Sequence, residues 1–285
     1  MSERVILQAC AKVNLFLRVL ARDADGYHSL ETLFCRLALA DTLTARRGTG
    51  RGVRLTVSGA DCGPEADNLA FRAVEALLRV VREPFAVELT LEKRIPVGAG
   101  LGGGSADAAA ALLAVNQLAG QGVPRAELLH LAAGLGADIP FCASGASLAL
   151  AWGRGERLLA LPALPPAPVL LLSPAVPVRT ADAYAWLDQA SRGARRGALA
   201  LEPAALAAWS DVARMAGNDF ESVVFGRLPA VREAFEALAR TGPLLCRMTG
   251  SGSTLVAVYR SERERDDARM ALGKKHGTLI ATRTG

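Results

Sequence analysis

The alternation of apolar and polar residues predicts that the first 95 residues consist mostly of β-strands. From Val13 to Val19 an apolar side chain recurs at every second position, which is the pattern of a strand that buries one face. The same alternation occurs over residues 53–57 and 85–91, and a further strand is expected over residues 147–152.

Three segments of the first half are expected to be helical, over residues 68–82, 105–119 and 125–133. Asp67 or Asn68 can cap the first of these helices. The second is rich in alanine, the strongest helix former. The third begins at Pro124, a residue that is favoured at a first helical position.

A cluster of prolines over residues 162–168 is the clearest compositional break in the chain. It predicts a boundary between an N-terminal domain over residues 1–160 and a C-terminal domain over residues 161–285. In the second domain the pattern predicts, in order, a strand over 169–172, several helices between 180 and 240, strands over 244–248 and 254–259, a helix and a short strand. Strands and helices mix without strict β-α-β alternation, so the fold class is predicted to be α+β.

Composition excludes several kinds of protein. The uncharged stretch over residues 158–178 holds six prolines, so it cannot form a membrane-spanning helix. The five cysteines are scattered without a Cys-x-x-Cys pair, and the three histidines lie far apart, which argues against a disulfide framework and a zinc site. The N-terminus lacks the shape of a signal peptide. We expect a cytoplasmic protein with no membrane partner.

The formal charge of +5 raises the question of an anionic polymer as partner. Arg192, Arg195 and Arg196 form the nearest thing to a basic cluster, but no nucleic-acid motif accompanies them, so no nucleic-acid partner is expected. Only four of the 33 basic residues are lysine. A lysine retained in so arginine-rich a chain is a candidate for a position that a guanidinium cannot fill. Lys12 is one such candidate, whereas chance explains Lys274 and Lys275 near the C-terminus.

Five glycines fall within the seven residues from Gly98 to Gly104, directly before the alanine-rich helix. Glycine lets the backbone approach a ligand closely, and N–H groups that lead into a helix N-terminus bind phosphate. Ser105 can cap the helix and offer a hydroxyl to a phosphate oxygen or to Mg²⁺. The alternative is a flexible loop that ends a strand.

A Walker A loop is excluded, because Ser105-Ala106 follows the last glycine instead of Lys-Ser or Lys-Thr. A dinucleotide fingerprint also matches poorly, and the other protein-kinase motifs are absent.

Three segments occur in order along the chain: Ala-Lys-Val-Asn-Leu over residues 11–15, Pro-Val-Gly-Ala-Gly-Leu-Gly-Gly-Gly-Ser-Ala over residues 96–106, and Met-Thr-Gly-Ser-Gly-Ser over residues 248–253. Together they resemble the three motifs of the GHMP kinases, the superfamily of galactokinase, homoserine kinase and mevalonate kinase. Within it, Asp-Gly-Tyr-His-Ser-Leu over 25–30 and Gly-Ala-Asp-Ile-Pro-Phe over 136–141 resemble the 4-diphosphocytidyl-2-C-methyl-D-erythritol kinase family.

This resemblance implies a two-domain fold with the active site in the cleft between the domains, and ATP-dependent phosphorylation of the substrate's C2 hydroxyl in non-mevalonate isoprenoid synthesis. Asp138 would be the base and Lys12 would stabilise charge. From the residues alone, Asp138 is also explained as a turn or cap residue before Pro140. Lys12 and Asn14 are two residues apart on a strand, so they point to the same face.

The resemblance also implies binding residues. The cytidyl substrate would contact Asn14, Tyr27, His28, Thr180 and Tyr184, with the tyrosines and His28 at the base. ATP would contact Asn68, Lys93, Pro96, Val97, Gly98, Ala99, Gly100, Leu101, Gly102, Gly103, Gly104, Ser105 and Ala106. The third glycine motif supplies Thr249, Gly250, Ser251 and Gly252. Asp107 is expected to complement the helix dipole. The segment after Pro140 lacks the basic side chains of some relatives.

ATP and Mg²⁺ are the implied cofactors, and the ligands of the metal stay unknown. The implied partners are small molecules, and the protein is expected to be a monomer or a homodimer. Two alternatives stay open: a GHMP kinase for another small alcohol such as homoserine or mevalonate, and a sensor on the same fold without catalytic activity. The Asp-Gly-Tyr-His segment argues against the first, and Lys12 with Asp138 argues against the second.

Overall fold

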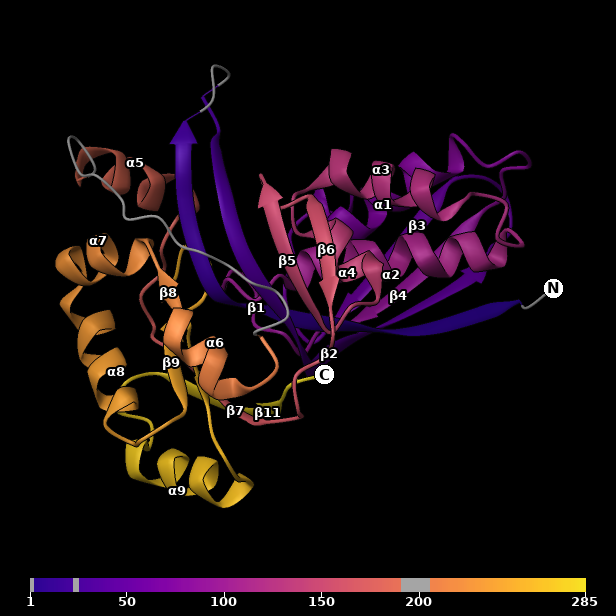
Figure 1. Cartoon of the computed structure of the whole chain (residues 1–285). Coiled ribbons are helices and arrows are strands. Elements are labelled where there is room, and N and C mark those ends of the chain that lie inside the picture. Colours follow the sequence, from indigo (N-terminus) through magenta and orange to yellow (C-terminus); the bar gives the residue numbers. More distant parts are fainter. Residues whose placement is uncertain (1–2, 23–25, 191–205) are drawn as a thin grey trace.

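The computed structural model describes residues 3–22, 26–190 and 206–285, and it contains two β-sheets with helices packed around them (Figure 1). The N-terminal half contains β1 (Arg4–Arg22), β2 (His28–Arg47), β3 (Val53–Ser58), the 3₁₀ turn η1 (Glu65–Asp67), α1 (Leu69–Leu78), β4 (Val87–Glu92), α2 (Gly103–Leu118), α3 (Arg125–Leu135), α4 (Ile139–Ser144), β5 (Leu148–Gly153) and β6 (Arg157–Leu161). The C-terminal half contains β7 (Pro168–Ser173), α5 (Thr180–Ala190), α6 (Trp209–Met215), β8 (Gly217–Asn218), α7 (Phe220–Arg227), α8 (Pro229–Ala239), β9 (Leu245–Met248), β10 (Leu255–Val258), α9 (Glu262–Leu272) and β11 (Thr278–Arg283).

The mixed α+β class is confirmed, and most predicted elements are present within a few residues of their expected ends. The cap of α1 is Asn68, whose side chain accepts a hydrogen bond from the backbone N–H of Ala70. That helix ends at Leu78 instead of continuing to residue 82. Helix α2 begins two residues earlier than expected, because Gly103 and Gly104 already belong to it.

The two long strands β1 and β2 form an antiparallel ribbon that joins the two halves of the molecule. Strand β1 pairs with β2 along most of its length, and its other edge pairs with the short strand β8. The other edge of β2 pairs with β5 near its start and with β4 near its end. In the described chain this gives a seven-stranded sheet in the order β3-β4-β2-β1-β8, with β5 and β6 attached at β2.

The prediction that β1 buries only one face was wrong. Lys12, Asn14 and Phe16, which lie on the expected polar face, are 4%, 3% and 3% exposed. The apolar residues Val13 and Leu15 pack against the second sheet, whereas Lys12 and Asn14 are covered by the glycine loop and the loop 249–252.

Helix α2 is buried on nearly every side, against strands of the first sheet and helices α1 and α3. Its run of alanines permits this, because small side chains let a helix lie close to its neighbours all round. The N-terminus of the helix is thereby held at a fixed place beside the ribbon, where the glycine loop enters it.

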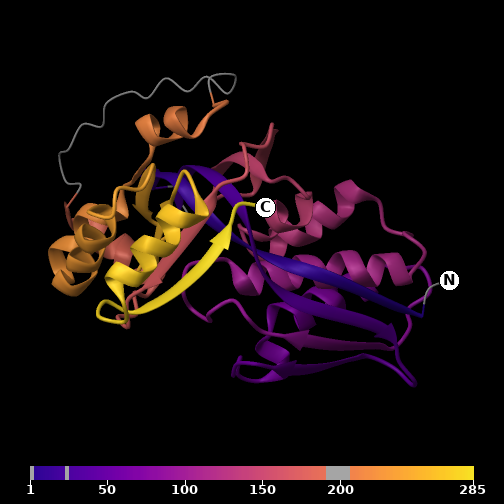
Figure 2. The same cartoon turned by 90° about the horizontal axis from the view of Figure 1, so that it is seen from below.

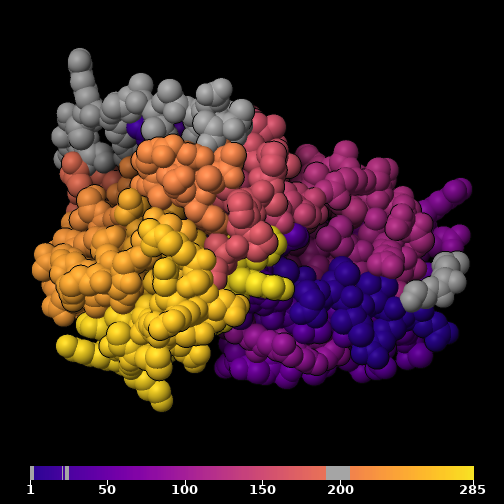
Figure 3. All heavy atoms as spheres, turned by 60° about the horizontal axis from the view of Figure 1, so that its bottom comes forward, coloured from indigo at the N-terminus to yellow at the C-terminus, as the bar shows by residue number. Residues whose placement is uncertain are grey.

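The second sheet, β11-β7-β10-β9, is antiparallel, and its central strands β7 and β10 are buried on both faces. Along β7, Leu170 and Leu172 pack toward α5, α7, α8 and α9, while Val169 and Leu171 pack toward the ribbon. Figure 2 shows the yellow strand β11 beside the yellow helix α9, and Figure 3 shows the orange and yellow C-terminal elements against the indigo and magenta N-terminal ones. Leu17 and Val19 of the ribbon join the apolar cluster of the C-terminal elements, so the two halves share a core.

Asn218 of β8 connects the ribbon to the loop after β9. Its Nδ2 donates to the carbonyl oxygens of Met248 at 2.7 Å and Gly250 at 2.8 Å, and its Oδ1 accepts from the N–H of Phe220. The residue is 8% exposed. This side chain therefore fixes the loop 249–252 relative to β1.

Replacing Asn218 with alanine should lower the free energy of unfolding by about 2 kcal/mol, because two buried carbonyls lose their donor. Ser222→Ala is the matched control, since Ser222 is exposed and should change stability by less than about 0.5 kcal/mol. Urea denaturation of both variants checks this. Equal stability of the two variants would show that Asn218 does not hold the loop.

Candidate active site

The three predicted motifs meet at the side chains of Lys12 and Asn14. Lys12 Nζ lies 3.0 Å from Asp138 Oδ2 and donates to Asn14 Oδ1 at 2.9 Å. The ammonium also lies 5.0 Å from the centre of the Phe34 ring. The Lys12 side chain is 5% exposed and that of Asp138 is 32% exposed, so a buried cation faces a carboxylate that solvent can reach.

Asn14 joins the first motif to the third. Its Oδ1 accepts from the N–H of Gly250 at 3.1 Å, and its own N–H donates to Thr249 Oγ1 at 2.9 Å. Its Nδ2 donates to Thr32 Oγ1 on the neighbouring strand at 2.7 Å. The amide is therefore held from several sides, which fixes where the Lys12 ammonium can lie.

The glycine loop passes directly over the Lys12 side chain. Gly98, Gly100 and Gly102 have φ values of +72°, +73° and +68°, a region that favours glycine. A Cβ at Gly102 would lie 2.8 Å from Lys12 Cγ and 2.9 Å from Lys12 Cε, so a side chain at this position would clash with the lysine. A Cβ at Gly100 would lie 3.2 Å from the Thr249 carbonyl oxygen. The loop thus packs against both other motifs.

The expected capping role of Ser105 was wrong. The cap of α2 is Gly102, which offers no side chain, and Ser105 is the third residue of the helix. The first N–H groups of α2 are therefore not capped by a side chain of the cap residue, and together with the positive end of the helix dipole they provide an anion site.

A second buried lysine lies beneath the start of α2. Lys93 Nζ lies 2.5 Å from Asp41 Oδ2 and 2.6 Å from Asp107 Oδ2. Asp41 Oδ1 accepts from the N–H of Ile95 at 2.8 Å. A Cβ at Gly103 would lie 3.4 Å from Lys93 Nζ. This cluster supports the segment that leads from β4 into the glycine loop.

The expectation that Asp107 complements the helix dipole was wrong, because the residue is 2% exposed and lies beyond the first turn. Burial raises the pKa of Asp107 to about 7, against the opposing effect of Lys93. Its Oδ1 has no hydrogen-bond partner among the described residues. Asp41 was missed from the sequence, although a carboxylate directly after the apolar run Leu37–Ala40 of β2 was a usable signal.

A cavity of about 1220 Å³ adjoins the Lys12–Asp138 pair. Gly136 and Ala137, which precede Asp138, line it together with the tip of the ribbon, helix α5 and the hairpin between β5 and β6. His28 and Tyr184 stack within it, with ring centroids 4.9 Å apart and 18° between the ring planes. His28 Nε2 lies 2.7 Å from Asp188 Oδ1. Asp188 was not identified from the sequence.

The predicted binding residues fall into two groups. Tyr27, His28, Thr180 and Tyr184 line the cavity, and the Thr180 hydroxyl lies 2.9 Å from that of Ser251 in the third motif. Asn68 and Lys93 lie apart from this cavity, at the starts of α1 and of the glycine loop. Tyr27 is 60% exposed, and Tyr184 stacks on His28.

Comparison with known proteins agrees with this geometry. The model of the GHMP kinases N terminal domain matches residues 68–146, and that of the GHMP kinases C terminal domain matches residues 201–278. The chain is 37% identical over 281 residues to the 4-diphosphocytidyl-2-C-methyl-D-erythritol kinase of Citrifermentans bemidjiense, covering 98% of both chains. It is 40% identical over 259 residues to that of Solibacter usitatus, covering 89% of this chain and 81% of the relative.

The chain belongs to the GHMP kinase family. Within it, the chain groups with the proteins named 4-diphosphocytidyl-2-C-methyl-D-erythritol kinase. A crystal structure of 4-(cytidine 5'-diphospho)-2C-methyl-D-erythritol kinase matches 99% of both chains, with a TM-score of 0.82 and 35% identity. The protein is therefore an ATP-dependent small-molecule kinase. None of the helices in the described ranges combines the length and apolar character that crossing a bilayer requires.

Gly102→Ala should destabilise this kinase by about 1–3 kcal/mol more than Gly98→Ala, because overpacking against Lys12 adds to the backbone strain. Both glycines have nearly the same positive φ, but nothing lies within 4 Å of a Cβ at Gly98. Gly98→Ala therefore controls for the strain alone. Thermal unfolding measures the difference. Identical losses of stability in Gly102→Ala and Gly98→Ala would mean that Lys12 does not lie against Gly102.

Asp107→Asn should change how stability depends on pH. Because the folded pKa of about 7 exceeds the ordinary value of 3.8, the folded state holds a proton that the unfolded state releases. The stabilisation of the folded state by this bound proton is fully present below about pH 4 and is lost as pH rises to about 7. The stability of the wild type relative to the variant should thus fall between pH 5 and pH 7.5 in urea denaturation. A stability difference between the two proteins that stays constant across that pH range would contradict the raised pKa of Asp107.

Proposed function

We propose that this kinase transfers the γ-phosphate of ATP to the C2 hydroxyl of 4-diphosphocytidyl-2-C-methyl-D-erythritol, a step of non-mevalonate isoprenoid synthesis. The observation that carries the proposal is the position of the Lys12–Asp138 pair beside a cavity with stacked aromatic rings. A substrate with a nucleobase at one end and a reacting hydroxyl at the other fits such a cavity. The names of the relatives support the same substrate.

Asp138 is the base of the proposed reaction. Its side chain is 32% exposed and directly follows Gly136 and Ala137, which line the cavity, so it can accept the proton of a substrate hydroxyl. Lys12 orients the Asp138 carboxylate and offsets the negative charge that develops on the transferred phosphoryl group. The buried position of Lys12 strengthens this effect, since little water screens the ammonium.

The glycine loop from Pro96 to Ala106 positions the phosphates of ATP at the N-terminus of α2. Asn68, at the start of α1, lies where ATP's adenine would bind, whereas Lys93 is held by Asp41 and Asp107 beneath the loop and would act on ATP only through the backbone it supports. Mg²⁺ fits the residues present, because this ion takes most of its ligands from phosphates and waters and needs few from the protein. The described residues contain no cluster of three histidine, cysteine or acidic side chains. The Ser105 hydroxyl would hold the ion, which supplies charge neutralisation at the phosphates when bound.

The base of the substrate binds beside the aromatic residues of the cavity. The stack of His28 on Tyr184 leaves no room for a base between those two rings at 4.9 Å, so Tyr27 supplies the face on which cytosine stacks. His28, oriented by Asp188, reads the edge of the base. Thr180 and Asn14 complete the contacts with the substrate, together with Thr249, Gly250, Ser251 and Gly252.

Residues 1–160 and 161–285 form the two domains of the proposed enzyme, and the cleft between them holds the substrates. We place the enzyme in the cytoplasm, where its five free cysteines stay reduced. It acts as a monomer or a homodimer.

An ATP-consumption assay with a panel of alcohols tests the proposed substrate. Turnover should require the diphosphocytidyl compound, whereas homoserine and mevalonate should give none. Turnover on homoserine or mevalonate, without turnover on the cytidyl substrate, would replace the proposal with another GHMP kinase activity. No turnover on any alcohol would favour a non-catalytic sensor.

Lys12→Arg should reduce kcat by at least about 100-fold although it keeps the charge, because the larger guanidinium cannot fit beneath Gly102 and beside Asn14. Asp138→Asn should reduce kcat at least as much and leave ATP binding unchanged. Steady-state kinetics measures kcat of both variants, and titration with ATP measures their ATP binding. An active Lys12→Arg enzyme, or an unchanged kcat for Asp138→Asn, would remove that residue from the mechanism.

A further inference from the structure

The glycine loop has an exposed middle and ends that are held in the interior. Ile95, which precedes the loop, is 2% exposed, and the helix that follows the loop begins at Gly103. Between them Val97 is 59% exposed, and nothing lies within 4 Å of a Cβ at Gly98. Because glycines restrict the backbone little, such a loop keeps one shape only if its two ends are held at a fixed separation.

Asp41 holds the segment that leads into the loop. Its side chain is completely buried, and its Oδ1 accepts from the N–H groups of Arg94 and Ile95 at 2.5 and 2.8 Å. Its Oδ2 accepts from Lys93 Nζ at 2.5 Å. Three consecutive residues before the loop therefore bind one carboxylate of β2, which fixes them to the first sheet.

Lys93 connects this segment to the helix at the other end of the loop. The same ammonium donates to Asp107 Oδ2 on α2 at 2.6 Å. A Cβ at Gly103 would lie 3.0 Å from Ile95 Cγ2 and 3.4 Å from Lys93 Nζ, so the two ends of the loop also lie in close contact. The Lys93 side chain thus ties the residues before the loop to the start of α2.

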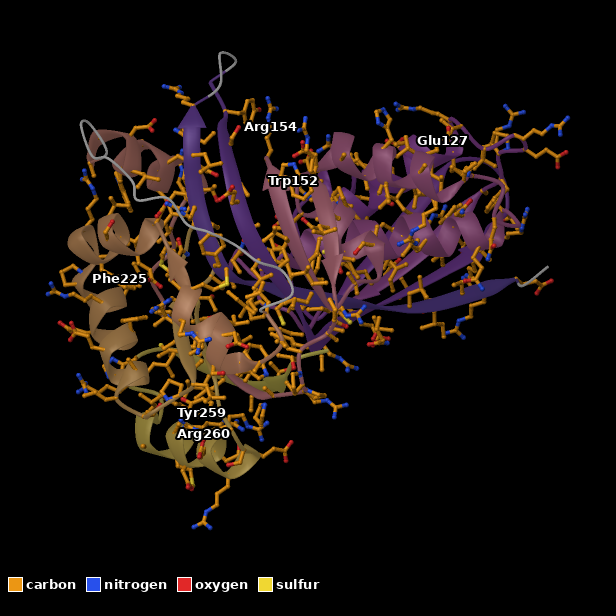
Figure 4. The ribbon with its side chains drawn as sticks, viewed as in Figure 1. Glu127, Trp152, Arg154, Phe225, Tyr259 and Arg260 are labelled. Atoms are coloured by element: carbon orange, nitrogen blue, oxygen red, sulfur yellow. The ribbon has the colours of Figure 1, made fainter. Side chains whose placement is uncertain are left out.

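The burial of these charges points to a geometric task. Charged side chains such as Glu127 and Arg260, labelled in Figure 4, are exposed to solvent. The side chains of Lys93 and Asp107 are each only 4% exposed. Removing ions from water costs free energy, and apolar side chains of the same volume often stabilise a protein as well or better. Charge-assisted hydrogen bonds are short and directed, however, so they can fix the separation of two segments.

We propose that Asp107 is a positioning residue, which through Lys93 holds the two ends of the glycine loop together so that the N–H groups of the loop and of α2 point at the same phosphates of ATP. This inference rests on the proposed ATP site. Neither side chain contacts the nucleotide in this role. Loss of the bridge should therefore weaken the binding of phosphates and leave the binding of adenine, which lies at Asn68, almost unchanged.

Titration calorimetry with ADP and with adenosine tests this role and needs no phosphate acceptor. Asp107→Ala should raise the Kd for ADP at least about tenfold and the Kd for adenosine less than about twofold, because only the phosphates bind at the loop. The variant should fold, since Lys93 and Asp41 still form an ion pair without net charge. Asp107→Asn should stay within about threefold of the wild type for ADP, because its amide oxygen still accepts a hydrogen bond from Lys93.

Asn116→Ala is the matched control on the same helix. Asn116 is 7% exposed, and its side chain exchanges two hydrogen bonds with the backbone of Val123. It lies about 20 Å along the helix axis from Gly103. This variant should lose thermal stability, as Asp107→Ala should, but should bind ADP like the wild type.

Four results would overturn the assignment. An unchanged Kd for ADP in Asp107→Ala would show that Asp107 does not set the shape of the loop. Equal losses for ADP and adenosine would mean that the whole nucleotide site is distorted. An equal loss of ADP affinity in Asn116→Ala would reduce the effect to lower stability. An Asp107→Asn variant as weak as Asp107→Ala would show that a hydrogen bond to Lys93 does not hold the loop.

The wild type itself tests the proposed ATP site separately. It should bind ADP more tightly than adenosine, because the phosphates add contacts at the loop. A wild type that binds both equally would overturn the proposed phosphate site, whatever the variants do.

Discussion

The burial of the Lys12 ammonium is the constraint on which the rest of the site depends. A buried cation is stable only when carboxylates and oxygen acceptors surround it, and Asp138 and Asn14 meet that need. Asn14 in turn holds the backbone of Gly250, and the glycine loop can lie over the lysine only because Gly102 has no side chain. Three segments that are distant in sequence are thereby fixed around one charge.

The retention of lysine at two positions in an arginine-rich chain has a physical explanation. Lys12 and Lys93 are both buried, and each donates to acidic or amide oxygens in a space that a guanidinium would overfill. One ammonium faces the catalytic carboxylate, and the other supports the backbone that enters the phosphate loop. Most of the arginines that the structure describes are exposed, and the cluster of Arg192, Arg195 and Arg196 lies outside the described residues.

Local patterns predicted much of the fold and part of the site. The two-residue spacing of Lys12 and Asn14 on a strand correctly put their side chains on one face, and the glycines before an alanine-rich segment correctly predicted a loop that enters a helix. The sequence could not show that the glycine loop and the loop 249–252 cover Lys12 and Asn14 on the polar face of β1, because those contacts join segments far apart in the sequence. Asp41, Asp188 and Asn218 were missed for the same reason, since each acts on a segment distant in sequence.

The central claim is that a nucleotide-bearing alcohol and the phosphates of ATP meet at Asp138 and Lys12. A crystal structure of the enzyme with a non-hydrolysable ATP analogue and the diphosphocytidyl substrate tests it most directly. The γ-phosphate should lie over the first residues of α2, with the substrate's C2 hydroxyl within hydrogen-bond distance of Asp138 and its base at Tyr27. A complex in which the hydroxyl lies away from Asp138, or the phosphates bind away from the glycine loop, would contradict the account.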